Sequence, residues 1–463
     1  MVNGIRRFRI VALASAAALA TLASAAARAD IFAATCVRGP TSQDIAIFNA
    51  SLGTSVALPG VVNTADGIER HPSISSDGRR LAFARLSGSS QRLIVADLST
   101  GQTADLFTGF EIAQSPIFGS AITPDGTAVA TGRPFRSFFS FRFPVATLTS
   151  LSSFPSGPFS RTTLSPTRFN ITTGPGGGHV EDIATGGGGN LLALHLDRTF
   201  ADSWLALVQR DGSSSLPLRM SDRTFSQPAL AAVNPASVLF VQQLRNTGSG
   251  TNVYLDRDIA FRPATLAGFP GTPTLLRLGV STPGRDESQP ALTADGRYVG
   301  FVRDAEGAND RLFVWDSQTQ IFLNPNGIDL GAIGTASGCR SLSLYTRSVI
   351  SSSAISQLGN VNATLTQASS IGIFVQRIVG TTKVLGRKAY ELETVGRFPL
   401  GMYGAGNVFT HWDFEVNGEP LPAGRYLVTL RAVEGDLVRE LGEPQVLRID
   451  MRGGTHMLGK DPR

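Results

Sequence analysis

Polar and charged side chains recur at the start of several short apolar runs in the chain. Three of these runs begin with the pairs His71-Pro72, Gln227-Pro228 and Gln289-Pro290. Side chains of these types at a strand entrance can bind a ligand through charge and hydrogen bonds. They can equally satisfy backbone groups of a neighbouring strand, which leaves a structural alternative open. The candidate binding residues are Glu69, Arg70, His71, Gln114, His179, Glu181, Gln227, Glu287 and Gln289.

Metal or hydrolytic chemistry would require further motifs. The five histidines form no His-x-x-x-His pair and no His-Glu-x-x-His motif, and no Gly-x-Ser-x-Gly elbow is present. His71 and His179 would make a metal site only if folding brought them together with Glu69 and Glu181. We therefore predict no catalytic residues, no metal and no cofactor, with a metal site as the alternative.

Aspartate precedes glycine at three similar places in the chain. The three residues are Asp77, Asp125 and Asp295. An aspartate in this position caps its own turn through its side chain, and the following glycine adopts positive φ without steric cost. Their repetition indicates a repeated turn rather than repeated catalytic carboxylates.

The stretch from Glu287 to Gln320 contains the element that surrounds such a turn. Short apolar runs at 291–293, 298–302 and 312–315 are separated by the Asp295-Gly296 turn and by a polar loop. An Asp-Gly turn between alternating runs predicts antiparallel strands. A three-stranded unit of this size cannot bury its own faces, so it must stack on copies of itself.

Five other segments repeat this pattern in whole or in part. The six segments begin 43 to 65 residues apart, at His71, Gln114, His179, Gln227, Gln289 and Ser337. A four-stranded unit of about 40–45 residues is typical of a propeller blade. We therefore predict an all-β chain with a six-bladed β-propeller over residues 30–350. The longer intervals predict insertions at about 134–178 and 257–285.

The best copies, at 69–102 and 287–320, resemble the TolB-type (WD40-like) propeller repeat. They share a proline, a Ser-x-Asp-Gly or Ala-Asp-Gly turn, an apolar-x-Phe strand and a strand ending in aspartate. The resemblance covers about 44–345 and implies a propeller, usually six-bladed, with roles in protein interaction or sensing. The α/β domain that precedes the propeller of TolB has no counterpart between Asp30 and Asp44. A metal site at the channel mouth, held by His71 and His179 with Glu69 and Glu181, would resemble that of lactonase-type propellers.

The repeats end near Ser351, and a different strand pattern follows. Strands are expected at 362–366, 371–378, 409–416, 421–433 and 445–451. About a hundred residues of short strands indicate a β-sandwich, which we place at 351–463. The segment Leu421 to Tyr426 resembles the Pro-x-Gly-x-Tyr edge of bacterial Ig-like or fibronectin-type modules.

The first 29 residues have the composition of a secretory signal peptide. Arginines at 6, 7 and 9 precede an apolar, alanine-rich run, and Ala27-Arg28-Ala29 is a small-x-small cleavage site. Loss of the four leader arginines lowers the formal net charge from +5 to about +1, which gives no argument for nucleic-acid binding. No later segment has the roughly 20 apolar residues of a membrane span.

The two ends of the propeller region complement each other. Residues 44–58 resemble the end of a repeat without its beginning, and residues 337–350 a beginning without an end. We expect the two to form one composite blade, in which residues 44–48 pair with a strand within 337–350. This would remove the open edges of a linear array. The chain has two cysteines, Cys36 and Cys339, and both fall in this blade. A disulfide between them is expected in an exported protein, and two unrelated buried thiols are the alternative.

These expectations combine into one functional hypothesis. They indicate a monomeric, periplasmic or secreted protein that binds an envelope protein or glycan through the mouth of the propeller channel. The alternative is a propeller enzyme, lactonase-like or glycan-acting, with a polar or metal site at the same mouth.

Overall fold

The computed structural model describes residues 31–460 apart from 39–42, 51, 89, 107–118, 137–141, 165–178, 187–190, 198–202, 210–212, 214–217, 219–222, 232–235, 247–252, 265–273, 276–279, 281–284, 294–295, 305–308, 332–341, 347–349, 367, 385–386 and 435–436. The predicted leader at 1–29 therefore lies outside the described residues. Within the described part all regular elements are β-strands, which confirms the all-β class. That part accordingly contains no helix that could span a membrane.

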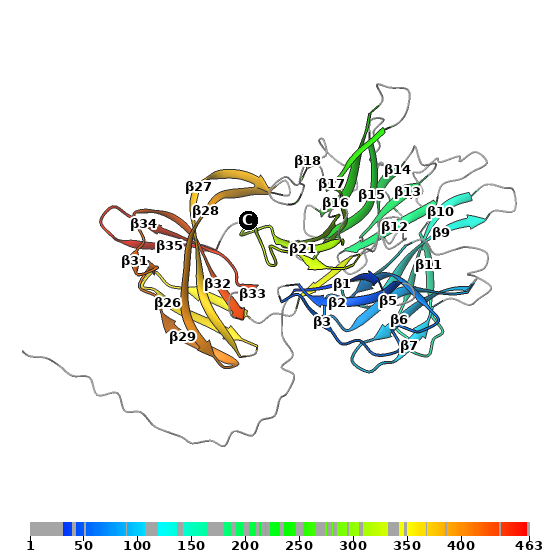
Figure 1. The fold of residues 1–463 in the computed structure, drawn as a ribbon, viewed down its shortest axis with the longest axis horizontal. Helices are drawn as coiled ribbons and strands as arrows, with labels where there is room; N and C mark the ends of the chain where they lie inside the picture. The colour runs from blue at the N-terminus through cyan, green and yellow to red at the C-terminus, as the bar shows by residue number, and fades with distance from the viewer. Residues whose placement is uncertain are drawn as a thin grey trace, which may run out of the picture.

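The described strands before residue 347 form six antiparallel sheets (Figure 1). The first is β24 (Ser343–Thr346), β1 (Ile31–Arg38), β2 (Gln43–Asn49) and β3 (Thr54–Val56). The second is β4 (Ile68–Ile74), β5 (Arg80–Ser87), β6 (Ser90–Asp97) and β7 (Thr103–Asp105). The third is β8 (Ser120–Ile122), β9 (Ala128–Arg136), β10 (Arg142–Ser150) and β11 (Arg161–Leu164).

The other three sheets follow in chain order. The fourth is β12 (His179–Gly186), β13 (Leu191–Asp197) and β14 (Ser203–Gln209). The fifth is β15 (Arg223–Ala231), β16 (Ala236–Asn246), β17 (Val253–Ala264) and β18 (Thr274–Leu275). The sixth is β19 (Glu287–Leu292), β20 (Tyr298–Arg303), β21 (Arg311–Asp316) and β22 (Ile321–Phe322), with β23 (Ile328–Asp329) also paired to β21.

The innermost strand of each sheet contacts the innermost strands of the two neighbouring sheets. The contacts run from β4 through β8, β12, β15, β19 and β24 and return to β4. Apolar clusters fill the space between adjacent sheets; one contains Phe301 and Trp315 of the sixth sheet with Leu239 and Phe261 of the fifth. This closed ring of sheets is a β-propeller, as the sequence predicted.

The first sheet joins the two ends of the propeller region, but not by the predicted pairing. β24 pairs with β1 through the register Phe32↔Tyr345 and Ala33↔Leu344, and β2 pairs with β1 and β3. The rings of Phe32 and Tyr345 stack at 4.8 Å between centroids. The direct pairing of residues 44–48 with the C-terminal segment was therefore wrong, because β1 lies between them. The N-terminal strands nevertheless complete the sheet that β24 begins.

The two predicted insertions contain regular strands of the sheets. Within the interval 134–178, β10 pairs with β9 and β11. Within 257–285, β17 continues to Ala264 and pairs with β18. The extra length therefore lies partly in long strands. The segment 133–143 includes the end of β9 and the start of β10.

The Asp-Gly turns have the predicted capping geometry where they are described. Asp77 accepts hydrogen bonds from the Ser75 hydroxyl and the Arg79 amide. Asp125 accepts from the Thr123 hydroxyl and the Thr127 amide at 2.6 and 3.0 Å. Burial alone would raise the pKa of Asp125, but these hydrogen bonds outweigh it and lower the pKa. Asp295 lies outside the described residues.

A second unit follows the propeller and consists of two main sheets and a small hairpin. The smaller sheet is β25 (Ile350–Ile355), β26 (Asn360–Leu365) and β29 (Gly406–His411). The larger is β28 (Arg387–Tyr403), β27 (Ser369–Val384), β32 (Gly424–Glu434), β34 (Gln445–Ile449) and β35 (Thr455–Lys460), with β33 (Leu437–Leu441) paired to β32. The hairpin is β30 (Glu415–Val416) and β31 (Glu419–Pro420).

One apolar cluster joins the two main sheets of this second unit. Val361 and Val408 of the smaller sheet share it with Ile373, Val428 and Leu447 of the larger. This arrangement is compatible with the predicted β-sandwich. The hydroxyl of buried Tyr426 donates to the Pro422 carbonyl at 2.6 Å. The tyrosine corner of Ig-like sandwiches uses the same kind of bond; the Ig-like assignment itself stays a prediction.

The second unit contacts the propeller through its long hairpin β27–β28. Gln376 Nε2 donates to the Thr319 carbonyl and Gln320 Nε2 to the Tyr390 carbonyl, both at 2.8 Å. Ala389 joins the apolar cluster of Trp315 in the propeller. The hairpin therefore fastens the second unit to the sixth sheet.

Candidate functional site

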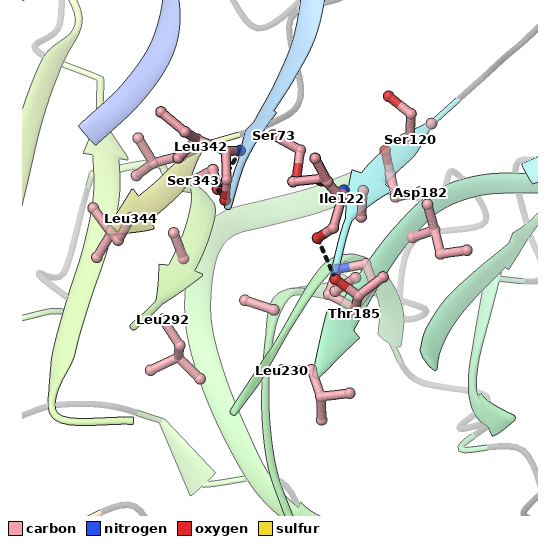
Figure 2. A pocket seen from close by; sticks show the side chains of 18 of the residues that line it. Ser73, Ser120, Ile122, Asp182, Thr185, Leu230, Leu292, Leu342, Ser343 and Leu344 are labelled. Atoms are coloured by element: carbon pink, nitrogen blue, oxygen red, sulfur yellow. Dashed lines mark hydrogen bonds between the residues drawn. The ribbon is translucent and has the colours of Figure 1, made fainter. Parts of the chain in front are cut away.

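A narrow cavity of about 100 Å³ lies where the innermost strands converge. All six of these strands contribute to its lining, and Figure 2 shows the lining side chains around the cavity. Its polar residues include Ser73, Ser120, Asp182, Thr185 and Ser343. The cavity is the central channel of the propeller.

Hydroxyl groups in the channel wall connect neighbouring sheets. Ser343 Oγ accepts a hydrogen bond from the Ile74 amide at 3.1 Å, and Ser73 Oγ accepts one from the Ile122 amide at 3.0 Å. The Thr185 hydroxyl donates to the Ile122 carbonyl at 2.7 Å (Figure 2). An innermost strand has one edge without a strand partner, and these bonds satisfy its backbone groups. Much of the channel's polar surface is therefore structural.

A β-bulge or register irregularity interrupts the innermost strand at four of the predicted binding residues, at Glu181 in β12 and at three residues with positive φ. His71, Gln227 and Gln289 have φ of 53°, 49° and 52°. The pairing register shifts at these residues in β4, β15 and β19. Positive φ is uncommon outside glycine, and bulges re-aim side chains at functional edges of sheets. The sequence predicted that these residues precede their strands, but they lie inside β4, β15 and β19, and no sequence signal indicated their conformation.

Two of the bulges are linked to the preceding sheet by side-chain acceptors. Gln227 Oε1 accepts the Gln289 amide at 2.6 Å, and Asp182 Oδ2 accepts the Gln227 amide at 3.4 Å. Each acceptor stabilises the strained residue of the next sheet. The Oε1 atom of Gln227 therefore has the structural role that was the alternative for these positions.

Glu69 and Glu287 are fully buried rather than open to the channel. Glu69 pairs with Arg85 at 2.7 Å and Glu287 pairs with Arg303 at 2.9 Å, and neither glutamate side chain has solvent exposure. They occupy matching positions of two repeats. Because a buried carboxylate with an arginine partner fixes the packing of a strand pair, we exclude both residues from the ligand-contacting set.

Arg70 and Gln227 remain as partly exposed members of the predicted set. Arg70 Nε donates to Gln43 Oε1 at 2.9 Å and so spans two sheets. Burial lowers the pKa of Arg70. His71 and Gln289 are buried, at 7% and 4% exposure. A partner at this mouth would therefore meet Arg70 and Gln227 first.

Three predicted positions lack a described side chain. Gln114 lies outside the described residues, and the side chains of His179 and Glu181 are outside the described part of β12. Among the residues that are described, no group of His, Cys, Asp and Glu side chains has the geometry of a metal site. The alternative of a metal site that includes His71 and His179 is thus not tested.

The channel hydroxyls were not singled out from the sequence. A comparison of the repeats would have indicated one of them: His71-Pro72 is followed by Ser73, whereas alanine follows at Ala229 and Ala291. A hydroxyl at an otherwise alanine position of an edge strand suggests a bond across the junction. Ser120 is another channel residue that was not singled out from the sequence. Its hydroxyl is buried in the channel wall and has no hydrogen-bond partner among the described residues.

Only one cysteine of the predicted disulfide, Cys36, lies in the described residues. Cys36 lies in β1, is fully buried and is not a free thiol. Cys339 lies outside the described residues, so its pairing with Cys36 stays a prediction.

No protein-family model matches the chain. No curated protein sequence matches it. Solved structures that resemble it include TolB from Acinetobacter baumannii, with 14% identity over 68% of this chain and 66% of that one, at a TM-score of 0.43. The β-propeller domain of Cps50 (Swd1) from Myceliophteria thermophila shares 14% identity over 73% and 93%, at a TM-score of 0.40. An oligogalacturonate lyase in complex with manganese shares 12% over 64% and 73%, at a TM-score of 0.37.

Proposed function

We propose that this chain is an exported, non-catalytic binding protein of the bacterial cell envelope. It engages a protein or glycan at the channel mouth formed by the bulged entrances of β4, β15 and β19. Arg70 and Gln227 make the contacts, and the buried residues behind them hold the bulges in position. The protein acts in the periplasm or outside the cell as a monomer.

The size of the channel is the observation that carries this proposal. Sites that enclose a small molecule usually measure about 300–1,000 Å³. The channel cavity, at about 100 Å³, is well below that range. It accommodates a single protruding group of a partner, whereas the rest of the partner must lie against the rim. This favours surface recognition of a macromolecule over enclosure of a substrate.

The test compares capture from envelope extract by the purified protein and by the double variant Arg70→Ala/Gln227→Ala. The variant should retain less than about a tenth of the captured partner. A triple change at Arg70, His71 and Gln289 would be a poorer test, because His71 and Gln289 are buried and their loss would also lower stability.

The matched control is Gln43→Ala, which removes the hydrogen bond of Arg70 but leaves both contact residues in place. It should capture the partner as the unaltered protein does. Equal capture by the double variant and the unaltered protein would refute a site at this mouth. A hydrolytic or lyase activity that disappears in the double variant would instead favour the enzymatic alternative.

A further inference from the structure

The outer face of the sheet β25–β26–β29 is polar and surrounds one exposed aromatic ring. Side chains alternate along a strand, so Val361 and Val408 enter the core while their neighbours point outward. The neighbours include Asn362 on β26 and Phe409 on β29, which lie directly opposite each other in the register. Phe409 is 74% exposed.

Hydrogen bonds hold the side chains on both sides of this ring. On one side the Ser352 hydroxyl donates to Thr364 Oγ1 at 3.1 Å, and the Thr364 hydroxyl donates to Asn407 Oδ1 at 3.0 Å. On the other side His411 Nδ1 lies 3.3 Å from Asn360 Oδ1. The first row crosses all three strands, and the second joins β26 and β29. They fix polar groups in place, and pre-organised groups bind with a smaller entropic cost.

The row between them contains the groups that remain open to a ligand. It consists of Ala354, Asn362 and Phe409, which the register aligns across the three strands. All three are exposed. A small residue, an amide and a phenyl ring therefore form a shallow strip between two polar rows. By strand geometry the whole face measures about 14 Å along the strands and about 10 Å across them.

We propose that this face binds a neutral glycan. A pyranose ring is apolar on its C–H face and carries hydroxyls around its edge. Phe409 provides the flat apolar surface, and the amides of Asn362, Asn360 and Asn407 provide donors and acceptors for the hydroxyls. The strip and its two rows are large enough for a short oligosaccharide.

Charge and area select this ligand over other partners. The face residues named above include no lysine or arginine, and Asp413, which pairs with His411 at 2.8 Å, places a carboxylate at the rim. Nucleic acids and acidic glycans need cationic side chains, which the face does not offer. One aromatic side chain is also too little apolar surface for the hydrophobic centre of a protein interface.

Isothermal titration of the purified full chain tests the proposal with cellohexaose and chitohexaose as neutral probes and oligogalacturonate as the anionic comparison. At least one neutral probe should bind and the anionic probe should not. Phe409→Ala should weaken binding by about tenfold or more, and Phe409→Tyr should preserve it. Asn362→Ala should weaken binding severalfold. Phe409 is exposed, so these changes should leave the melting temperature unchanged.

The matched control is Leu458→Ala, which removes a side chain that is 54% exposed on β35 of the other sheet. It should bind the probe normally, and so should the channel variant Arg70→Ala/Gln227→Ala, which separates this site from the proposed mouth. Failure of both neutral probes to bind would overturn the proposal. Unchanged binding in Phe409→Ala, or a face that captures only a protein, would also overturn it.

Discussion

The Ile74 amide donates to the Ser343 hydroxyl at 3.1 Å across a sequence separation of 269 residues. This bond joins β4 of the second sheet to β24, the last strand of the propeller region. β24 pairs in turn with β1, the first strand. It therefore lies at the junction where the propeller closes. At the next junction Ser73 makes the equivalent bond to the Ile122 amide. The closing junction and an ordinary junction between sheets are thus held by the same bond, from a backbone amide to a serine hydroxyl.

Ser343→Ala should loosen the closing junction selectively. Loss of the hydroxyl leaves the Ile74 amide without its acceptor, which costs about 1–3 kcal/mol. Hydrogen exchange followed by mass spectrometry should show faster exchange in β24 and β1. Ser73→Ala is the matched control and should instead affect the junction of β4 with β8. An exchange pattern that is identical in the two variants would contradict a local role for Ser343.

The predicted Cys36–Cys339 bond would fasten the same junction covalently. It would close a loop of about 300 residues, and the chain-entropy model gives about 5 kcal/mol for that length before strain is subtracted. Cys36→Ser, Cys339→Ser and the double variant should lower the melting temperature equally. Alkylation of the unfolded, unreduced protein should find no free thiol. Two alkylated cysteines, or additive effects of the two substitutions, would rule out the bond.

The sequence predicted the propeller because its repeats carry local signals. The Asp-Gly turns at Asp77 and Asp125 fix where each hairpin reverses, and the capping bonds formed there are short-range. The pattern before the turn marks the innermost strand. These signals depend on neighbouring residues alone, so they can be recognised in a single sequence.

Among the strands that the sequence did not predict, β1 and β28 were missed for opposite reasons. β1 is buried on both faces over most of its length, so its apolar residues show no alternation. β28 is the edge strand of its sheet and exposes many side chains, including Glu391 and Glu393, so it has no continuous apolar face. β1 also pairs with β24, which is distant in sequence, and local patterns cannot indicate such a pairing.

The described members of the predicted site lie in the innermost strands, but the sequence did not indicate the role of each side chain. Glu69 and Glu287 stand beside the channel residues in sequence, yet alternation turns them toward the arginines of the paired strand. Whether a strand-entrance residue faces the channel depends on the bulge that follows it. The bulges at His71, Gln227 and Gln289 require positive φ in residues that rarely adopt it, so no sequence rule indicated them.

Loss of one member of the Glu69–Arg85 pair should lower stability more than loss of both members. Arg85 also donates to the carbonyls of Val61 and Val62 and lies over the ring of Phe83. Arg85→Met leaves the buried Glu69 carboxylate without its partner and should lower the free energy of unfolding by about 3–5 kcal/mol. Urea denaturation provides the measurement.

The double variant Glu69→Leu/Arg85→Met is the control for this prediction. It removes both charges and should recover part of the loss caused by Arg85→Met, because no buried charge is left unpaired. Arg92→Met, in an exposed pair with Asp105, should change stability by less than about 1 kcal/mol. Strictly additive effects of the Glu69 and Arg85 substitutions would contradict a coupled pair.

Asp97 at the end of β6 should make the stability of the propeller depend on acid pH. Burial alone would raise its pKa, but hydrogen bonds from Ser99, Arg79 and Thr100 outweigh burial and lower the pKa to about 2. The pKa is thus lower in the folded state than the ordinary value of 3.8. The stabilisation is therefore complete above about pH 4 and is lost as the pH falls through about 2. Its size is at most about 2 kcal/mol.

Asp97→Asn should lower stability at neutral pH and flatten the loss between pH 4 and 2 in urea titrations, whereas Asp105→Asn on the exposed end of β7 should keep the steeper profile. An Asp97→Asn protein that loses as much stability as the unaltered protein over this interval would show that other carboxylates control the acid transition.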